Sequence, residues 1–139
     1  MNKGVFVDTS AWIMLLNRSQ SKHAEAKRIY GTLASSRLIT TNLVLGETYT
    51  WLRIKSDSKT AHDYLTSLQR KKELGQLEIY FSDYDLELTA GLLLRKYADH
   101  PFSYADAVSF ALMMKKGLKK AFAYDRHFIT AGYTLINQL

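Results

Sequence analysis

Residues 5–16 read VFVDTSAWIMLL, and this stretch decides which kind of fold the chain adopts. The apolar run at 5–7 is rich in β-branched and aromatic side chains, which predicts a buried strand. Residues 8–10 carry the side chains of a helix N-cap, and the apolar residues 11–16 continue as a helix. A buried strand that passes directly into a helix indicates the first unit of an α/β fold.

The same alternation continues along the chain. Further strands are expected at 38–39, 77–81, 121–124 and 133–136, and helices at 22–34, 43–55, 58–72, 82–97 and 103–116. The only proline, Pro101, lies in the loop before the last helix. Strands that alternate with helices predict a parallel sheet covered by helices on both faces.

The composition excludes several classes of protein. A chain of 139 residues is expected to form a single domain, residues 1–139, with a substantial core. It has no run of about 18 apolar residues for a membrane span and no N-terminal apolar region of about 7–15 residues for a secretory signal. It also has no cysteine for disulfides or thiolate metal sites. These features favour a cytoplasmic protein that does not enter the membrane.

The chain is basic, with 19 lysine and arginine residues against 13 aspartate and glutamate residues and a net charge of +6. Positive charge favours a nucleic-acid partner, although ordinary solubilising charge explains this value equally well. Basic clusters at 70–72, 115–116 and 119–120 are candidates for contacts with RNA phosphates. Lysines at helix ends also complement the helix dipole, so the clusters alone do not identify the partner.

Four carboxylates stand where the local pattern least favours a charge: Asp8, Glu47, Asp106 and Asp125. Asp8 and Asp125 follow predicted strands, and ligands of open α/β sheets bind beyond the carboxyl ends of strands. If the fold gathers all four, they form an acidic pocket that needs cations or protons to offset its charge. Oxygen ligands of this kind favour Mg²⁺ or Mn²⁺.

Three of these carboxylates also have a purely structural interpretation. Asp8 is a good N-cap for the helix that follows it. Asp106 completes the capping box Ser103-Tyr104-Ala105-Asp106. Asp125 is able to open a turn. None of the three identifies a site by itself, and only their convergence under one fold indicates one.

Glu47 has the strongest argument from patterning. Residues 43, 44, 47, 51 and 54 share one face of the predicted helix and read Leu, Val, Glu, Trp and Ile. A glutamate inside such an apolar face has to reach solvent, a partner or a metal ion, because an unpaired buried charge is very costly. The structural alternative is an edge position from which the side chain reaches water.

Four segments resemble the acidic motifs of the PIN-domain nucleases: VFVDTSAWI at 5–13, TTNLVLGET at 40–48, SYADAVSFALMMKK at 103–116 and AFAYDRHF at 121–128. Their order and spacing and the total length are closest to the VapC-like toxins of type II toxin–antitoxin pairs. The resemblance covers essentially the whole chain. It implies a small PIN-like α/β/α sandwich with a mainly parallel sheet, and metal-dependent endoribonuclease activity.

The resemblance also implies a role for each site residue. The four acids of the family fall on Asp8, Glu47, Asp106 and Asp125, which would be the catalytic residues and would hold Mg²⁺ or Mn²⁺. Supporting hydrogen bonds are expected from Thr9, Ser10 and Ser103, with Asp99 as a further supporting acid; capping and a surface loop explain these four residues as well.

The sequence departs from the family pattern in two respects. Many members carry Thr or Ser shortly before the fourth acid, where this chain has Ala123 and Tyr124. Many also carry another acid two residues after the fourth, where this chain has His127. The four histidines show no metal-ligand spacing, so zinc is not expected. These departures leave a second metal position open.

The resemblance implies an RNA substrate, a cognate antitoxin that covers the active site, and a homodimer. Two alternative functions remain. One is a non-catalytic PIN-like module for binding RNA or protein. The other is a Mg²⁺-dependent phosphatase on another α/β fold with Asp8 as nucleophile, which is disfavoured because Ser10 stands where such enzymes usually carry a second aspartate.

Overall fold

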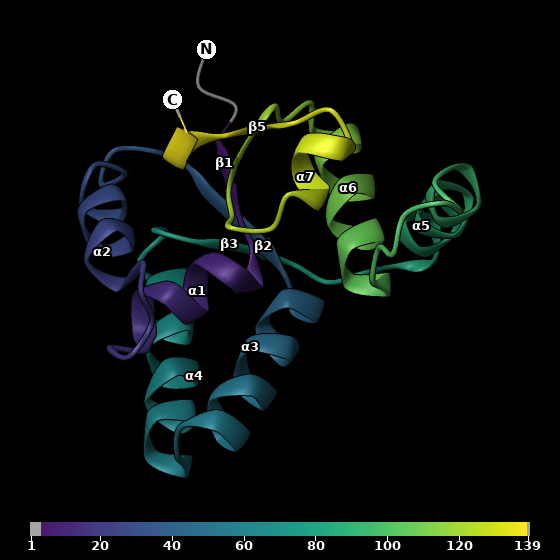
Figure 1. The fold of residues 1–139 in the computed structure, drawn as a ribbon. Coiled ribbons are helices and arrows are strands. Elements are labelled where there is room, and N and C mark those ends of the chain that lie inside the picture. Colours follow the sequence, from purple (N-terminus) through teal and green to yellow (C-terminus); the bar gives the residue numbers. More distant parts are fainter. Residues whose placement is uncertain (1–3, 139) are drawn as a thin grey trace.

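A computed structural model describes residues 4–138. Its strands form one sheet in the order β3-β2-β1-β4-β5 (Figure 1). They are β1 (Val5–Val7), β2 (Leu38–Thr41), β3 (Glu78–Tyr80), β4 (Lys120–Phe122) and β5 (Thr134–Leu135). All four pairings between these strands are parallel. The predicted mainly parallel sheet is therefore confirmed.

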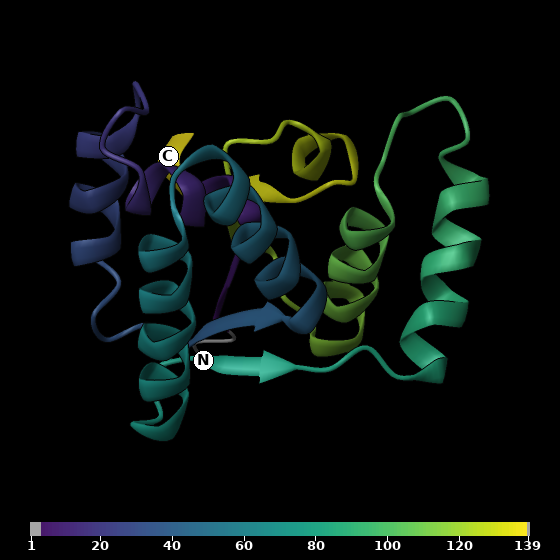
Figure 2. The same ribbon diagram turned by 90° about the horizontal axis from the view of Figure 1, so that it is seen from below.

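The helices form two groups around this sheet. They are α1 (Thr9–Leu16), α2 (His23–Gly31), α3 (Asn42–Lys55), α4 (Ser58–Glu73), α5 (Tyr84–Lys96), α6 (Tyr104–Lys116) and α7 (His127–Thr130), and a 3₁₀ helix (Ile136–Gln138) follows β5. Figures 1 and 2 show α1 to α4 on one side of the molecule and α5 and α6 on the other. The chain steps from β1 to β3 and then returns across the sheet to β4. Because such crossovers are right-handed, the two groups cover opposite faces, which confirms the α/β/α sandwich.

Most element boundaries fall within a few residues of the predicted ones. The helix expected at 22–34 ends at Gly31, and the strand expected at 38–39 extends to Thr41. The extension is stabilised by the Thr40 hydroxyl, which donates a 2.9 Å hydrogen bond to the Val7 carbonyl of β1. The sequence pattern missed α7 and the 3₁₀ helix because elements of three or four residues are too short to show a helical period.

The core centres on β1 and α6. Phe6 and Val7 are fully buried, and all residues of α6 from 105 to 113 are buried. The burial follows from position, because α6 packs between the sheet and α5, the outermost helix in Figures 1 and 2. The rings of Phe110 and Phe128 meet edge to face at 4.9 Å. This packing holds the middle of α6 against α7, the short helix that follows β4 and Asp125.

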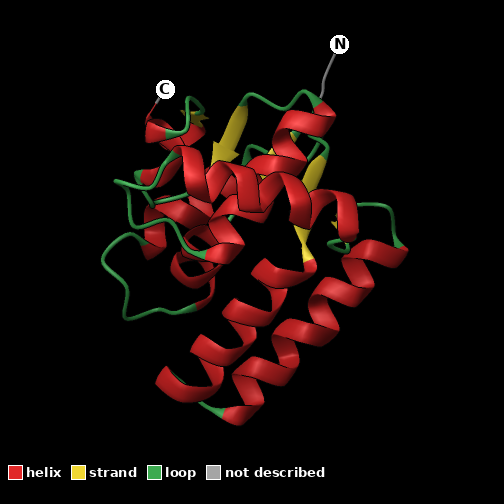
Figure 3. Ribbon diagram, turned by 90° about the vertical axis from the view of Figure 1, so that its right-hand side faces the viewer, coloured by secondary structure: helices red, strands yellow, loops and turns green. Residues whose placement is uncertain are grey.

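A helical hairpin, α3 and α4, extends away from the sheet (Figure 3). Asp57 caps the second helix by accepting a 2.7 Å hydrogen bond from the Thr60 amide, as the sequence pattern predicts. The first helix of the hairpin starts directly after β2 and presents its first two turns to the carboxyl end of the sheet. None of the helices within residues 4–138 has the length and apolar character that crossing a bilayer requires.

Candidate active site

Two of the predicted acids follow the adjacent strands β1 and β4 at their carboxyl ends. Asp8 follows β1, and its amide donates a 3.0 Å hydrogen bond to the Phe122 carbonyl at the end of β4. Asp125 lies three residues beyond that carbonyl. The chain leaves β1 for one face of the sheet and β4 for the other, so this is the point where a crevice forms in open α/β sheets.

The other two acids reach the same end from helices. Glu47 comes from the second turn of α3, and Asp106 comes from the first turn of α6. The negative charge of Asp106 acts on Asp8 and Glu47, and the charge of Asp125 acts on Glu47 as well. The structure therefore gathers the four acids that the sequence singled out, from residues as far apart as 8 and 125.

Asp8 is the most enclosed of the four, with only 5% of its surface exposed. Its Oδ2 accepts hydrogen bonds from the Ser10 amide (3.3 Å) and the Ser10 hydroxyl (2.8 Å). That hydroxyl also accepts a 2.9 Å hydrogen bond from the Tyr124 amide, so Ser10 ties the two strand ends together. Burial raises the pKa of Asp8 to about 7; the Ser10 hydrogen bonds oppose this rise and the charge of Asp106 adds to it.

Asp106 is held by the capping box that the sequence predicts. The Asp106 amide donates a 3.0 Å hydrogen bond to the Ser103 hydroxyl, and the Ser103 amide donates one of 3.0 Å to Asp106 Oδ2. His127 Nδ1 also lies 3.0 Å from the same Oδ2. Asp106 therefore caps the helix and belongs to the acid group at the same time, because the capping box holds its carboxylate close to the other acids.

Asp125 and His127 form a tight turn at the start of α7. Asp125 Oδ1 accepts a 2.8 Å hydrogen bond from the His127 amide, and His127 Nδ1 lies 3.2 Å from the same oxygen. One potential ligand atom each from Asp106, Asp125 and His127 lies within 4.8 Å of the others. Sequence reasoning noted His127 only as a departure from the family, because its partner Asp106 lies 21 residues away on another element.

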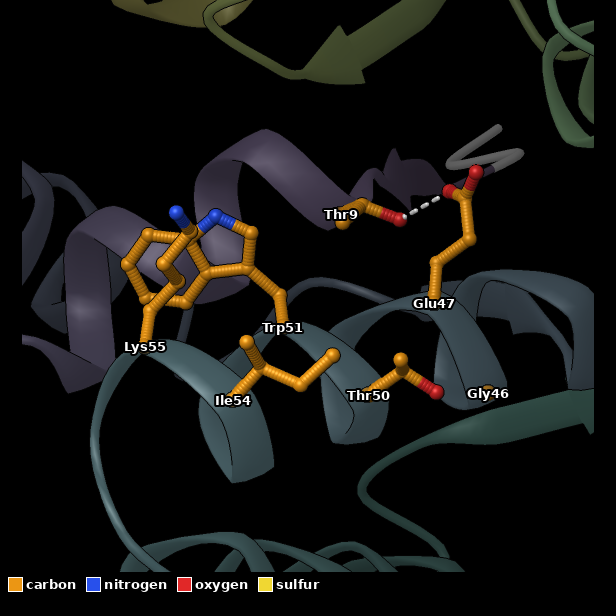
Figure 4. Close-up of a pocket in the computed structure, with 7 residues that line it drawn as sticks. All are labelled: Thr9, Gly46, Glu47, Thr50, Trp51, Ile54 and Lys55. Carbon is orange, nitrogen blue, oxygen red and sulfur yellow. Dashed lines mark hydrogen bonds between the residues drawn. The ribbon is translucent and has the colours of Figure 1, made fainter.

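Glu47 is joined to the site through Thr9, whose hydroxyl donates a 2.8 Å hydrogen bond to Glu47 Oε1 (Figure 4). Partial burial raises the pKa of Glu47; the Thr9 hydrogen bond opposes the rise, and the charges of Asp106 and Asp125 add to it. The charged form of the carboxylate is therefore disfavoured at both Asp8 and Glu47.

The patterning argument for Glu47 is wrong, although its position is the expected one. The buried face of α3 consists of Val44, Thr48 and Leu52. The face that carries Glu47 is open, and Ile54 on that face is 70% exposed. The apolar residues 51 and 54 line a groove at the surface, because α3 packs on α1 and α4 with its other side. Glu47 thus stands at the rim of this groove and not inside a buried stripe.

The donor set fits a divalent cation. Hydrogen bonds from the protein hold one oxygen of each carboxylate: Oδ2 of Asp8, Oε1 of Glu47, Oδ2 of Asp106 and Oδ1 of Asp125. The Asp8 carboxylate also accepts a backbone hydrogen bond from Thr9. Within residues 4–138, no lysine or arginine forms an ion pair with any of the four. Gathered carboxylates that have no lysine or arginine partner among these residues need a cation to stabilise their charged forms.

Comparison with known proteins agrees with this geometry. A family model described as PIN domain matches residues 5–132. The chain belongs to the PIN-domain family. It is 35% identical over 129 residues to the 23S rRNA-specific endonuclease VapC20 of two Mycobacterium tuberculosis strains, CDC 1551 / Oshkosh and ATCC 25618 / H37Rv. The match spans 93% of this PIN domain and 95% of each relative.

Two solved structures resemble this PIN domain. One is M. tuberculosis VapC20, described as a sarcin–ricin loop cleaving toxin, with a TM-score of 0.84 at 34% identity over 94% of this chain and 96% of that one. The other, FitAcB from Neisseria gonorrhoeae, has a TM-score of 0.66 at 14% identity over 94% and 95% of the two chains, which is a likeness of fold alone. The predicted kinship with VapC-like ribonuclease toxins is confirmed, and the phosphatase on another fold is excluded.

Two other groups of predicted residues lie away from the acids of the PIN domain. Asp99 is exposed in the turn after α5 and makes no hydrogen bond or ion pair observed within residues 4–138. The basic cluster 70–72 lies in the last turn of α4, the cluster 115–116 ends α6, and the cluster 119–120 lies at the start of β4. All three therefore lie toward the amino-terminal ends of the strands, opposite the acids, where they do not line the active site.

Proposed function

We propose that this PIN domain, residues 1–139, is a divalent-metal-dependent endoribonuclease and the toxin of a toxin–antitoxin pair. The observation that carries the proposal is the group of four carboxylates, which form no ion pair with a lysine or arginine of residues 4–138. The kinship with VapC20 over nearly the full length of both chains supports the ribonuclease activity.

Each acid has a distinct task in this proposal. Asp8 and Asp106 are direct ligands of Mg²⁺ or Mn²⁺, and Asp125 binds the ion directly or through water. Glu47, exposed at the rim, orients the attacking water. When bound, the cation activates water and offsets the charge that develops on the phosphodiester. Ser10, Ser103 and Thr9 fix the carboxylates before RNA arrives, so little reorganisation is required.

The target we propose is 23S rRNA, at a loop of the sarcin–ricin type, because those words describe the activity of VapC20. An RNA loop suits a PIN domain whose acids lie at the carboxyl ends of its strands, since the unstacked bases of a loop expose the RNA backbone. A cytoplasmic location is part of the same proposal, because a ribosomal target would be met there.

We further propose that the antitoxin binds the groove beside Glu47. The groove has a volume of about 550 Å³ and is lined by Thr9, Gly46, Glu47, Thr50, Trp51, Ile54 and Lys55 (Figure 4). Its apolar wall leads from Trp51 and Ile54 to the acidic rim. An antitoxin segment with apolar side chains followed by a basic one would match this order and would cover the site. Trp51→Ala is expected to weaken antitoxin binding and to leave RNA cleavage by the free toxin intact.

The homodimer is proposed to form through α5. Tyr84, Leu88 and Leu92 are 76%, 51% and 64% exposed and recur every four residues along this outermost helix. A stripe of this kind buries apolar area when two copies pack together. Leu88→Glu combined with Leu92→Glu is expected to give a monomer in light scattering, and an unchanged molar mass would exclude this interface.

The central experiment compares cleavage of a 23S rRNA loop oligonucleotide by wild type, Asp8→Asn and Asp106→Asn, with Mg²⁺, Mn²⁺ or EDTA. The matched control is Asp63→Asn, because Asp63 is an exposed acid on α4 that pairs with Lys59. Wild type and the control should cleave with metal and not with EDTA, whereas both site variants should be inactive. Cleavage by either site variant, or in EDTA, would refute the metal-dependent mechanism. Tight RNA binding without cleavage would favour the non-catalytic module.

A further inference from the structure

His127 is held in one orientation from two sides. Its amide is fixed by the 2.8 Å hydrogen bond to Asp125 Oδ1 at the start of α7. Its ring meets the Phe102 ring edge to face, with the centroids 5.1 Å apart. The side chain is 30% exposed, so the ring lies at the mouth of the acid group and not in the core. A ring fixed in this way presents Nδ1 in a defined direction.

That direction is toward two carboxylates. Nδ1 lies 3.0 Å from Asp106 Oδ2 and 3.2 Å from Asp125 Oδ1. Neighbouring ligands of an octahedral ion with bonds of about 2.1 Å are themselves about 3 Å apart. The separations from Nδ1 to its two neighbours therefore match those of ligands around one ion, with the cation taking the place of the proton on Nδ1.

The nature of the donor atom affects which ion is preferred. Mg²⁺ is a hard cation that selects oxygen ligands, whereas imidazole nitrogen binds first-row transition metals well. The sequence places His127 where many members of the family carry an acid. In this chain an oxygen donor is thus exchanged for a nitrogen donor at the edge of the same group of carboxylates.

We propose that His127 Nδ1 is a direct metal ligand together with Asp106 and Asp125, and that it makes this site prefer transition-metal ions such as Mn²⁺ to Mg²⁺. The proposal rests on the proposed function, because it requires the acids to hold a cation. A different role for His127 would be to hold Asp106 in place by hydrogen bonding alone, and the experiment has to separate these two roles.

The experiment measures metal binding by the full-length chain without RNA. Calorimetric titrations with Mn²⁺ and with Mg²⁺ compare wild type, His127→Asp, His127→Asn and the control His62→Ala on the remote hairpin. Loss of a nitrogen ligand should lower the Mn²⁺ affinity of His127→Asn by at least about tenfold. His127→Asp restores an oxygen ligand, so its ratio of Mn²⁺ to Mg²⁺ affinity should fall by about tenfold while Mg²⁺ binding is retained. His62→Ala should match wild type.

Pulsed electron paramagnetic resonance of bound Mn²⁺ provides the decisive readout. Wild type and His62→Ala should show coupling to a directly bound ¹⁴N nucleus, and both His127 variants should lack it. Mn²⁺ bound without ¹⁴N coupling, or wild-type affinity in His127→Asn, would refute the ligand role and leave His127 as a positioning residue. Asp106→Asn is titrated beside these variants to test the site as a whole. If wild type binds Mn²⁺ no better than Asp106→Asn, the proposed metal site itself fails, which is a different result.

Discussion

Replacing Asp8 with asparagine should stabilise the metal-free protein while abolishing RNA cleavage. Asp8 is almost completely buried, and its pKa rises from 3.8 to about 7, mainly through burial. The native state therefore binds this proton more tightly than the unfolded chain does. Stability is then highest where Asp8 is protonated in both states and falls as the pH rises from about 4 to about 7.

The magnitude follows from the size of the shift. One pKa unit corresponds to about 1.4 kcal/mol, so a rise of about three units costs the native state up to about 4 kcal/mol above pH 7. At about pH 5.5 the same relation gives a cost of about 2 kcal/mol. Asparagine does not ionise, and its side-chain oxygen still accepts the hydrogen bonds from Ser10. Asp8→Asn should therefore gain up to about 4 kcal/mol at pH 8 and about half of that at pH 5.5.

Urea unfolding in EDTA at the two pH values tests this expectation, with Asp99→Asn as an exposed control acid. Saturating Mn²⁺ should reverse the order, because a cation that binds only the native state stabilises wild type and not the variant. The idea that the buried negative charge of Asp8 destabilises the native state would be refuted if the variant were no more stable than wild type at pH 8. It would also be refuted if the gain in unfolding free energy did not depend on pH. An equal gain in Asp99→Asn would refute it as well.

Three further predictions concern the supports of the site. Gly4 has φ +104°, and a Cβ there would lie 2.8 Å from the Arg37 carbonyl oxygen; Gly4→Ala should cost about 1–3 kcal/mol in urea unfolding, and an unchanged midpoint would contradict this. Thr9→Val removes the hydrogen bond that lowers the pKa of Glu47, so the acidic limb of the pH–rate profile should move to higher pH; an unmoved limb would show that Glu47 does not control it. Ser103→Ala removes the capping hydroxyl and should cost about 1 kcal/mol and weaken Mn²⁺ binding in calorimetry, whereas Ser103→Thr should retain both; equal behaviour of the two variants would argue against support through the cap.

The sequence predicted the site acids largely through local rules. Asp8 and Asp125 were singled out because a carboxylate directly after an apolar strand lies at the carboxyl end of the sheet, where ligands of open α/β sheets bind. Asp106 was singled out because it stands in the first turn of an apolar helix, although it also forms a genuine capping box. Glu47 was placed with the other acids although the argument from its helix face was wrong. Sequence alone does not say which apolar face of a helix turns inward, and α3 buries Val44, Thr48 and Leu52 instead.

His127 shows the limit of that reasoning most clearly. Nothing within a few residues of His127 indicates that its ring meets Asp106, because the contact joins the start of α7 to the first turn of α6. For the basic clusters, local sequence suggested a role in the site that their position in the fold does not support. They suggested contacts with substrate phosphates, and the topology places them at the opposite ends of the strands.

The sequence by itself determined the alternation of strands and helices, the caps and the four carboxylates that depart from apolar surroundings. These features depend on hydrophobic periodicity and on hydrogen bonds between residues a few positions apart, and both can be recognised from short segments of the sequence. Only the tertiary structure decided which hydrogen bonds hold each carboxylate, that Asp8 is buried with a raised pKa, and that His127 joins the group. Those properties depend on burial and on distances between elements far apart in sequence, which arise only when the strands and helices pack.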